Sequence, residues 1–148
     1  MKKFWFVLLL IFPLFLFSQT YVSMWLPDIF SMKSDELSAL VTSKNSQVKM
    51  SDKEIAEVIK IINERKEEYL SLSEKSKKSI PVDANGKPIG KADPELIRAR
   101  EAVSSEVATS IYEFLGEKRF IQLKRTLMDE HERRNMEGLK KAMKNKKK

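Results

Sequence analysis

The chain has no cysteine, one histidine and only four glycines among its 148 residues. Without cysteine it can form no disulfide, carry no lipid on a cysteine, use no thiolate nucleophile and bind no zinc through sulfur. The single histidine leaves few ways to build a nucleophile–base pair, and no phosphate-binding loop with its lysine–serine ending is present. We therefore expect no catalytic residues, no cofactor and no metal ligands.

Sustained alternation of apolar and polar residues, the pattern of a β-strand, is also missing. Apolar residues recur instead at three- and four-residue steps, which is the pattern of amphipathic helices. The sequence predicts an all-α fold, a small bundle or extended hairpin of three long helices plus one short helix. The predicted helices cover residues 34–43 and 52–77, a third begins at Pro94 and ends before Gly116, and a fourth follows almost at once, with a connecting loop at 79–93.

The N-terminus has the plan of a secretory signal peptide. Lys2 and Lys3 precede an unbroken apolar run over residues 4–17, followed by Ser18. This run is shorter than the roughly 20 apolar residues that a membrane span needs. We expect residues 1–18 to be a cleaved signal peptide and the protein to be exported to the periplasm or cell envelope. The alternative is an uncleaved signal anchor, because apolar character resumes over residues 21–26.

Positive charge is concentrated at the C-terminus. The chain carries a formal net charge of +7, and its last ten residues contain no acid. The lysines of this stretch are Lys140, Lys141, Lys144, Lys146, Lys147 and Lys148. We expect a single helical domain over residues 19–143 and a solvated basic tail over 144–148. The alternative for the tail is contact with an anionic surface. Export argues against nucleic acid as a partner.

The helix boundaries carry clear signals. Ser51 and Glu54 form a capping box at the start of the second helix. Asp93 and Pro94 are typical of the first positions of the third helix, and Gly116 is typical of its end. The expected apolar face of the third helix consists of Leu96, Val103, Val107, Ile111 and Phe114. The expected face of the last helix consists of Phe120, Leu123, Leu127, His131, Leu139 and Met143.

The apolar stripes of these helices are narrow, which leaves little core for each helix. Pairing the same faces across two copies buries the remainder, so we expect a homodimer. His131 lies in a highly charged stretch of the last helix. We expect it to be a surface or seam residue, and its neighbour Met128 offers a soft-metal alternative.

Two short segments have similar layouts, residues 50–55 and 115–120. Each places an apolar residue, a helix-start or turn residue, two further residues, a long polar residue and an apolar one. This layout resembles the twin LTxxQ motif of the Spy/CpxP family of periplasmic helical proteins. Serine and glycine stand where the motif has threonine, and glutamate and arginine stand where it has glutamine. The matching positions are Met50, Ser51, Glu54, Leu115, Gly116 and Arg119.

The resemblance implies a cradle-shaped dimer that chaperones unfolded clients or senses envelope stress without a nucleotide. Together with the residues themselves, it leads us to expect an exported, non-enzymatic helical binding protein whose partner is an unfolded or folded protein. One alternative is a membrane-tethered structural or coiled-coil adaptor. The other is a metal-binding envelope protein.

Overall fold

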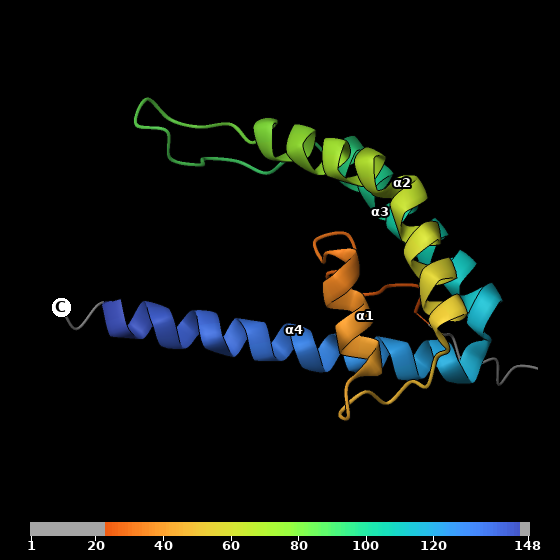
Figure 1. The fold of residues 1–148 in the computed structure, drawn as a ribbon. Coiled ribbons are helices and arrows are strands. Elements are labelled where there is room, and N and C mark those ends of the chain that lie inside the picture. Colours follow the sequence, from red (N-terminus) through yellow and green to blue (C-terminus); the bar gives the residue numbers. More distant parts are fainter. Residues whose placement is uncertain (1–22, 146–148) are drawn as a thin grey trace, which may run out of the picture.

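The computed structural model describes residues 23–145, which form four helices (Figure 1). The predicted all-α fold is confirmed. The helices are α1 (Ser34–Thr42), α2 (Asp52–Lys78), α3 (Pro94–Leu115) and α4 (Glu117–Asn145). The expected signal peptide lies outside the described residues, as do residues 146–148, whereas Lys144 belongs to α4. None of the helices in the described part combines the length and apolar character needed to cross a bilayer.

The predicted helix starts have the expected capping contacts. At α2, the Glu54 carboxylate accepts a hydrogen bond from the Ser51 amide at 2.8 Å, and the Ser51 hydroxyl faces the Glu54 amide at 3.4 Å. At α3, the Asp93 carboxylate accepts from the Glu95 amide at 2.9 Å, and Pro94 occupies the first turn. These contacts satisfy amide groups that have no partner within the helix. They explain why both starts are readable from sequence.

The loop over residues 79–93 is a turn excursion at the far end of the α2/α3 hairpin. Val82 and Pro88 form an isolated antiparallel bridge, and the Asp83 carboxylate accepts from two amides of the turn at 2.9 and 2.8 Å. Gly86 has a positive φ of 77°, which glycine adopts without steric cost. The loop therefore closes on itself by local contacts.

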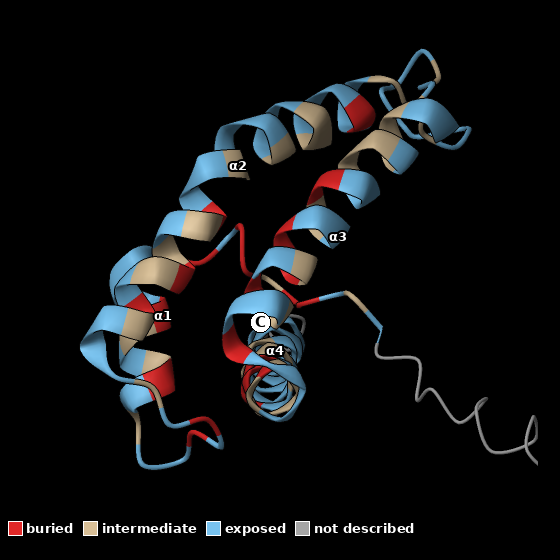
Figure 2. Cartoon of the chain, turned by 90° about the vertical axis from the view of Figure 1, so that its right-hand side faces the viewer, coloured by how far each residue is buried: buried red, intermediate tan, exposed pale blue. Residues whose placement is uncertain are grey.

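Helices α2 and α3 run side by side as a curved pair, and α4 passes beneath them at a steep angle (Figures 1 and 2). The N-terminal half of α4 and helix α1 lie against this pair, whereas the C-terminal half of α4 extends beyond α1. Loop 79–93 extends in the same general direction from the other end of the pair. The described chain is therefore an open, bracket-like shape rather than a closed bundle.

The buried core lies where α1, the α2/α3 pair and the first half of α4 meet. It includes residues 26–32, a segment whose mixed spacing predicts neither a helix nor a strand. Five residues of this segment are buried, namely Leu26, Pro27, Ile29, Phe30 and Met32. The buried hydrophobic residues are Leu26, Ile29, Phe30, Met32, Leu37, Val41, Val48, Ile55, Val58, Ile62, Val103, Val107, Ala108, Ile111, Leu115, Phe120, Leu123 and Leu127.

Two predicted faces need correction. Phe114 is 43 % exposed, and Leu115 takes its place in the core. The residues predicted to form one apolar face of α4 lie on two different sides of the helix. Leu127 is fully buried, whereas Leu139 and Met143 are 60 % and 66 % exposed. At 3.6 residues per turn, Met143 lies about 160° around the helix from Leu127. Most of the residues predicted for this face are four or eight positions apart. Because four residues exceed one turn by about 40°, the later residues of the set lie progressively further around the helix.

Candidate functional site

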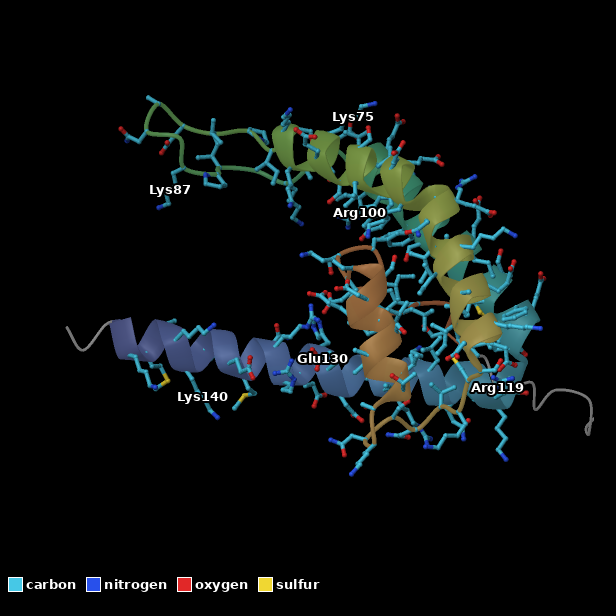
Figure 3. The ribbon with its side chains drawn as sticks, viewed as in Figure 1. Lys75, Lys87, Arg100, Arg119, Glu130 and Lys140 are labelled. Carbon is cyan, nitrogen blue, oxygen red and sulfur yellow. The ribbon has the colours of Figure 1, made fainter. Side chains whose placement is uncertain are left out.

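The two motif-like segments meet in the fold. Arg119, in the first turn of α4, donates to the Glu54 carboxylate at 2.6 Å and to the Lys49 carbonyl at 3.0 Å (Figure 3). Glu54 is the residue that completes the capping box with Ser51. One guanidinium therefore joins the start of α4 to the start of α2 and to the chain that precedes it.

The remaining motif residues surround this ion pair without forming a reactive site. Leu115 is buried, Met50 packs against the core, and Gly116 has a φ of 77° that turns the chain from α3 into α4. The Arg119 guanidinium, assisted by Ser51, lowers the pKa of Glu54 to about 2. A carboxylate with so low a pKa is a poor general base at neutral pH. The six residues together form a structural junction.

His131 also contacts a distant part of the chain. Its Nδ1 lies 2.7 Å from the Asp28 carboxylate, and its Nε2 lies 3.0 Å from the Asn135 side-chain amide. In the tautomer with the proton on Nδ1, His131 donates to Asp28 and accepts from Asn135. Asp28 has a positive φ of 57° in the turn before α1. His131 is therefore a seam residue that holds this turn against α4, with both ring nitrogens engaged.

The charged side chains around His131 form no metal-binding cluster in the part of the chain that the structure describes. No group of three or more histidine, aspartate or glutamate side chains within residues 23–145 is arranged to hold a metal ion. Glu130 accepts hydrogen bonds from Arg133 and Arg134, which lower its pKa to about 2. These side chains form an ion-pair network along α4.

A hollow of about 360 Å³ opens between the N-terminal segment and the α2/α3 pair. Trp25 is 48 % exposed at this hollow, and Lys124 lies 6.0 Å from the centre of its ring. Tyr69 stacks on the core residue Phe30 with a centroid distance of 4.0 Å. Arg100 lies on the side of α3 that faces α1 (Figure 3). The lining residues are Met24, Trp25, Tyr69, Arg100, Glu101, Ser104 and Ser105.

No sequence pattern predicts this hollow, because its lining comes from two helices and from a segment that precedes the first predicted helix. The one feature of the sequence that could have indicated the hollow is Trp25, an aromatic residue in the segment before α1. In the fold this segment lies against the core, which places Trp25 beside α3.

Comparison with known proteins gives no further assignment. No protein-family model matches the chain, and neither the curated proteins nor the solved structures contain a significant match.

Proposed function

We propose that this chain is a non-enzymatic binding protein that acts outside the cytoplasm and holds a segment of another polypeptide at the hollow beside Trp25. The observation that carries the proposal is the chemistry of the hollow. It combines an exposed indole, a guanidinium, a carboxylate and two serine hydroxyls in about 360 Å³. Ligand sites have volumes of about 300–1,000 Å³.

A polypeptide segment fits these groups better than a small polar molecule does. Met24 and Trp25 offer apolar contact to a side chain, while Ser104 and Ser105 can hydrogen-bond to backbone amides and carbonyls. Arg100 and Glu101 place both charge signs at the same hollow, so the site selects no single charge. Such a mixture suits many polypeptide sequences.

The proposed binding is chaperone-like and independent of ATP. Three features support it: the apolar N-terminal run expected to direct export, the absence of a phosphate-binding loop from the sequence, and the resemblance of residues 50–55 and 115–120 to the Spy/CpxP motif. The net charge of +7, which becomes +5 when Lys2 and Lys3 are removed with the expected signal peptide, adds a long-range attraction to acidic clients. This attraction weakens with salt because exposed charges are screened beyond about 8–10 Å.

The test is the aggregation of an unfolded client protein with and without the full chain, in the absence of ATP. We expect the chain to slow aggregation at low salt, and less so at high salt. Trp25→Ser should weaken protection several-fold. Phe114→Ser is the matched control, because Phe114 is an aromatic side chain of similar exposure that does not line the hollow.

A direct measurement accompanies the aggregation assay. In a Trp5→Phe background Trp25 is the sole tryptophan, so its emission should shift when a client peptide is added. No protection at stoichiometric excess in low salt would contradict the chaperone proposal. Equal loss in the Trp25 and Phe114 variants would place the binding surface elsewhere.

The adaptor alternative is favoured by one observation, the half of α4 that extends beyond the core (Figure 1). An adaptor tethered by an uncleaved N-terminus would retain residues 1–18. Intact-mass analysis of the protein from the cell envelope decides this point. Cleavage before Gln19 supports a free binding protein, whereas a retained N-terminus supports the adaptor.

A further inference from the structure

Helix α4 carries an apolar stripe that faces away from the core. We name it the outer stripe and define it as Met128, Met136, Leu139 and Met143. Their exposed fractions are 40 %, 54 %, 60 % and 66 %, and none belongs to the core. At 3.6 residues per turn, Leu139 lies about 160° around α4 from the buried Leu123. We propose that the outer stripe is a docking surface for an anionic lipid membrane.

Lysines accompany this stripe. Lys140 and Lys144 follow Leu139 and Met143 directly in α4, and Lys141 lies one position further on from Lys140. Figure 3 shows Lys140 pointing away from α1, on the side where sulfur atoms are visible along the same half of the helix. After Glu137 the sequence has no acid and ends in three more lysines. At 3.6 residues per turn, Lys140 and Lys144 lie about 60° and 100° around the helix from Met143, on one flank of the stripe, and Lys141 lies on the opposite face. An apolar stripe with lysines on its polar side is the pattern of a helix that lies in a membrane interface.

The surface is free to lie flat on a membrane. The distal half of α4 extends beyond α1 (Figure 1). The buried side chains of α4 are Phe120, Leu123, Thr126 and Leu127. Its last contacts with other elements are those of His131 with Asp28 and of Arg134 with Glu36. Docking of residues 136–144, which lie beyond these contacts, therefore requires no rearrangement of the core.

Charge argues against a second copy as the occupant. In an antiparallel pair that sets Met136 against Leu139 of the other copy, Arg133 and Lys140 come to lie on the same flank. In a parallel pair, residues 140–144 of both copies lie at the same end, so their lysines gather there. Both arrangements bring like charges together, which is unfavourable across a helix pair. An anionic lipid surface instead attracts every lysine of the segment.

The absence of cysteine allows a probe at one position. Ala142→Cys, at the edge of the stripe, is labelled with an environment-sensitive dye in the full chain. We expect its emission to shift to the blue with vesicles of phosphatidylcholine mixed with phosphatidylglycerol, but not with phosphatidylcholine alone, and the shift to be lost at high salt. Ala84→Cys in the 79–93 loop should show no shift. This control separates α4 from any insertion of the apolar N-terminus, which is present in both proteins.

Two sets of variants test the chemistry of the surface. Replacing Lys140, Lys141 and Lys144 by glutamine should weaken vesicle binding reported by the Ala142→Cys probe at least tenfold. The matched control replaces Lys77, Lys87 and Lys91, which are exposed and lie outside α4. Leu139→Ser should reduce the blue shift while circular dichroism shows unchanged helix content.

Several results would overturn the proposal. An equal response to neutral vesicles, or equal loss in both lysine sets, would show that the α4 lysines do not recognise the lipid charge. A blue shift that grows with protein concentration in the absence of lipid would identify a second copy as the occupant. A response to soluble polyglutamate as large as the response to anionic vesicles would identify an acidic polypeptide instead.

Discussion

Two leucines of α4 offer a direct test of how this helix is divided. Leu127 is fully buried in the core, whereas Leu139 is 60 % exposed and belongs to no cluster. Both leucines lie inside the same helix, so Leu127→Ala and Leu139→Ala make the same chemical change in the same secondary structure and differ only in burial. Alanine has a higher helix propensity than leucine, so neither substitution weakens the helix itself.

The expected costs differ several-fold. Leu127→Ala removes buried methylene and methyl groups and leaves a cavity, which costs about 2–5 kcal/mol. For a domain of this size, a loss of about 3 kcal/mol lowers the melting temperature by on the order of 10 °C. Leu139→Ala removes a side chain that is mainly in water, so its effect should lie within about 0.5 kcal/mol.

The assay is thermal and urea unfolding followed by circular dichroism at several protein concentrations. Each full-length variant is compared with the unmodified chain. A Leu139→Ala variant that is destabilised as strongly as Leu127→Ala would refute the division of α4 into two faces. If that destabilisation disappeared on dilution, it would show that a second copy buries Leu139.

Three further predictions concern the caps and the ion pairs. Ser51→Ala should cost about 0.5–2 kcal/mol, towards the lower end because the 2.8 Å bond from the Ser51 amide to Glu54 survives; a melting curve tests this. Gly116→Ala should cost about 1–3 kcal/mol, because φ 77° and ψ 162° is a region that only glycine adopts readily, although a Cβ there meets no atom within 4 Å; urea unfolding tests it. Arg133 and Arg134 lower the pKa of Glu130 from 4.5 to about 2, so the unfolded chain binds more protons between these values and stability should fall as the pH falls from about 4.5 to 2. Urea midpoints over this range should vary less with pH in Glu130→Gln.

The helices were predictable because their signals are local. The predicted second helix, residues 52–77, ends one residue before α2 does, and the predicted first helix ends one residue after α1. Capping side chains such as Ser51 and Asp93 act within three residues of their own position, so their effect can be read without knowing the fold. Gly116 ends α3 for an equally local reason, its positive φ.

The direction in which a helix faces was harder to predict, because it depends on distant partners. Met143 and Leu127 are both apolar and stand at helical spacing, yet only Leu127 meets another element. The contribution of residues 26–32 was missed for the same reason. Their spacing fits neither a helix nor a strand, and they are buried because the chain returns across α4, where Asp28 meets His131.

The junction at Arg119 joins two segments that look alike in sequence but do different things in the fold. Residues 50–55 and 115–120 drew attention because they resemble each other, and a repeated motif leads one to expect two equivalent roles. In the fold the roles are complementary, because Glu54 accepts from Arg119 and the two side chains bear opposite charges. The glutamate also completes the α2 cap, so a single carboxylate links a local start signal to a contact 65 residues away. Exchanging the two side chains, Glu54→Arg with Arg119→Glu, would keep the charge pair but remove the acceptor of the Ser51 amide. We therefore expect the exchanged protein to be less stable than the original chain, and a urea midpoint equal to the original would show that the cap contributes nothing.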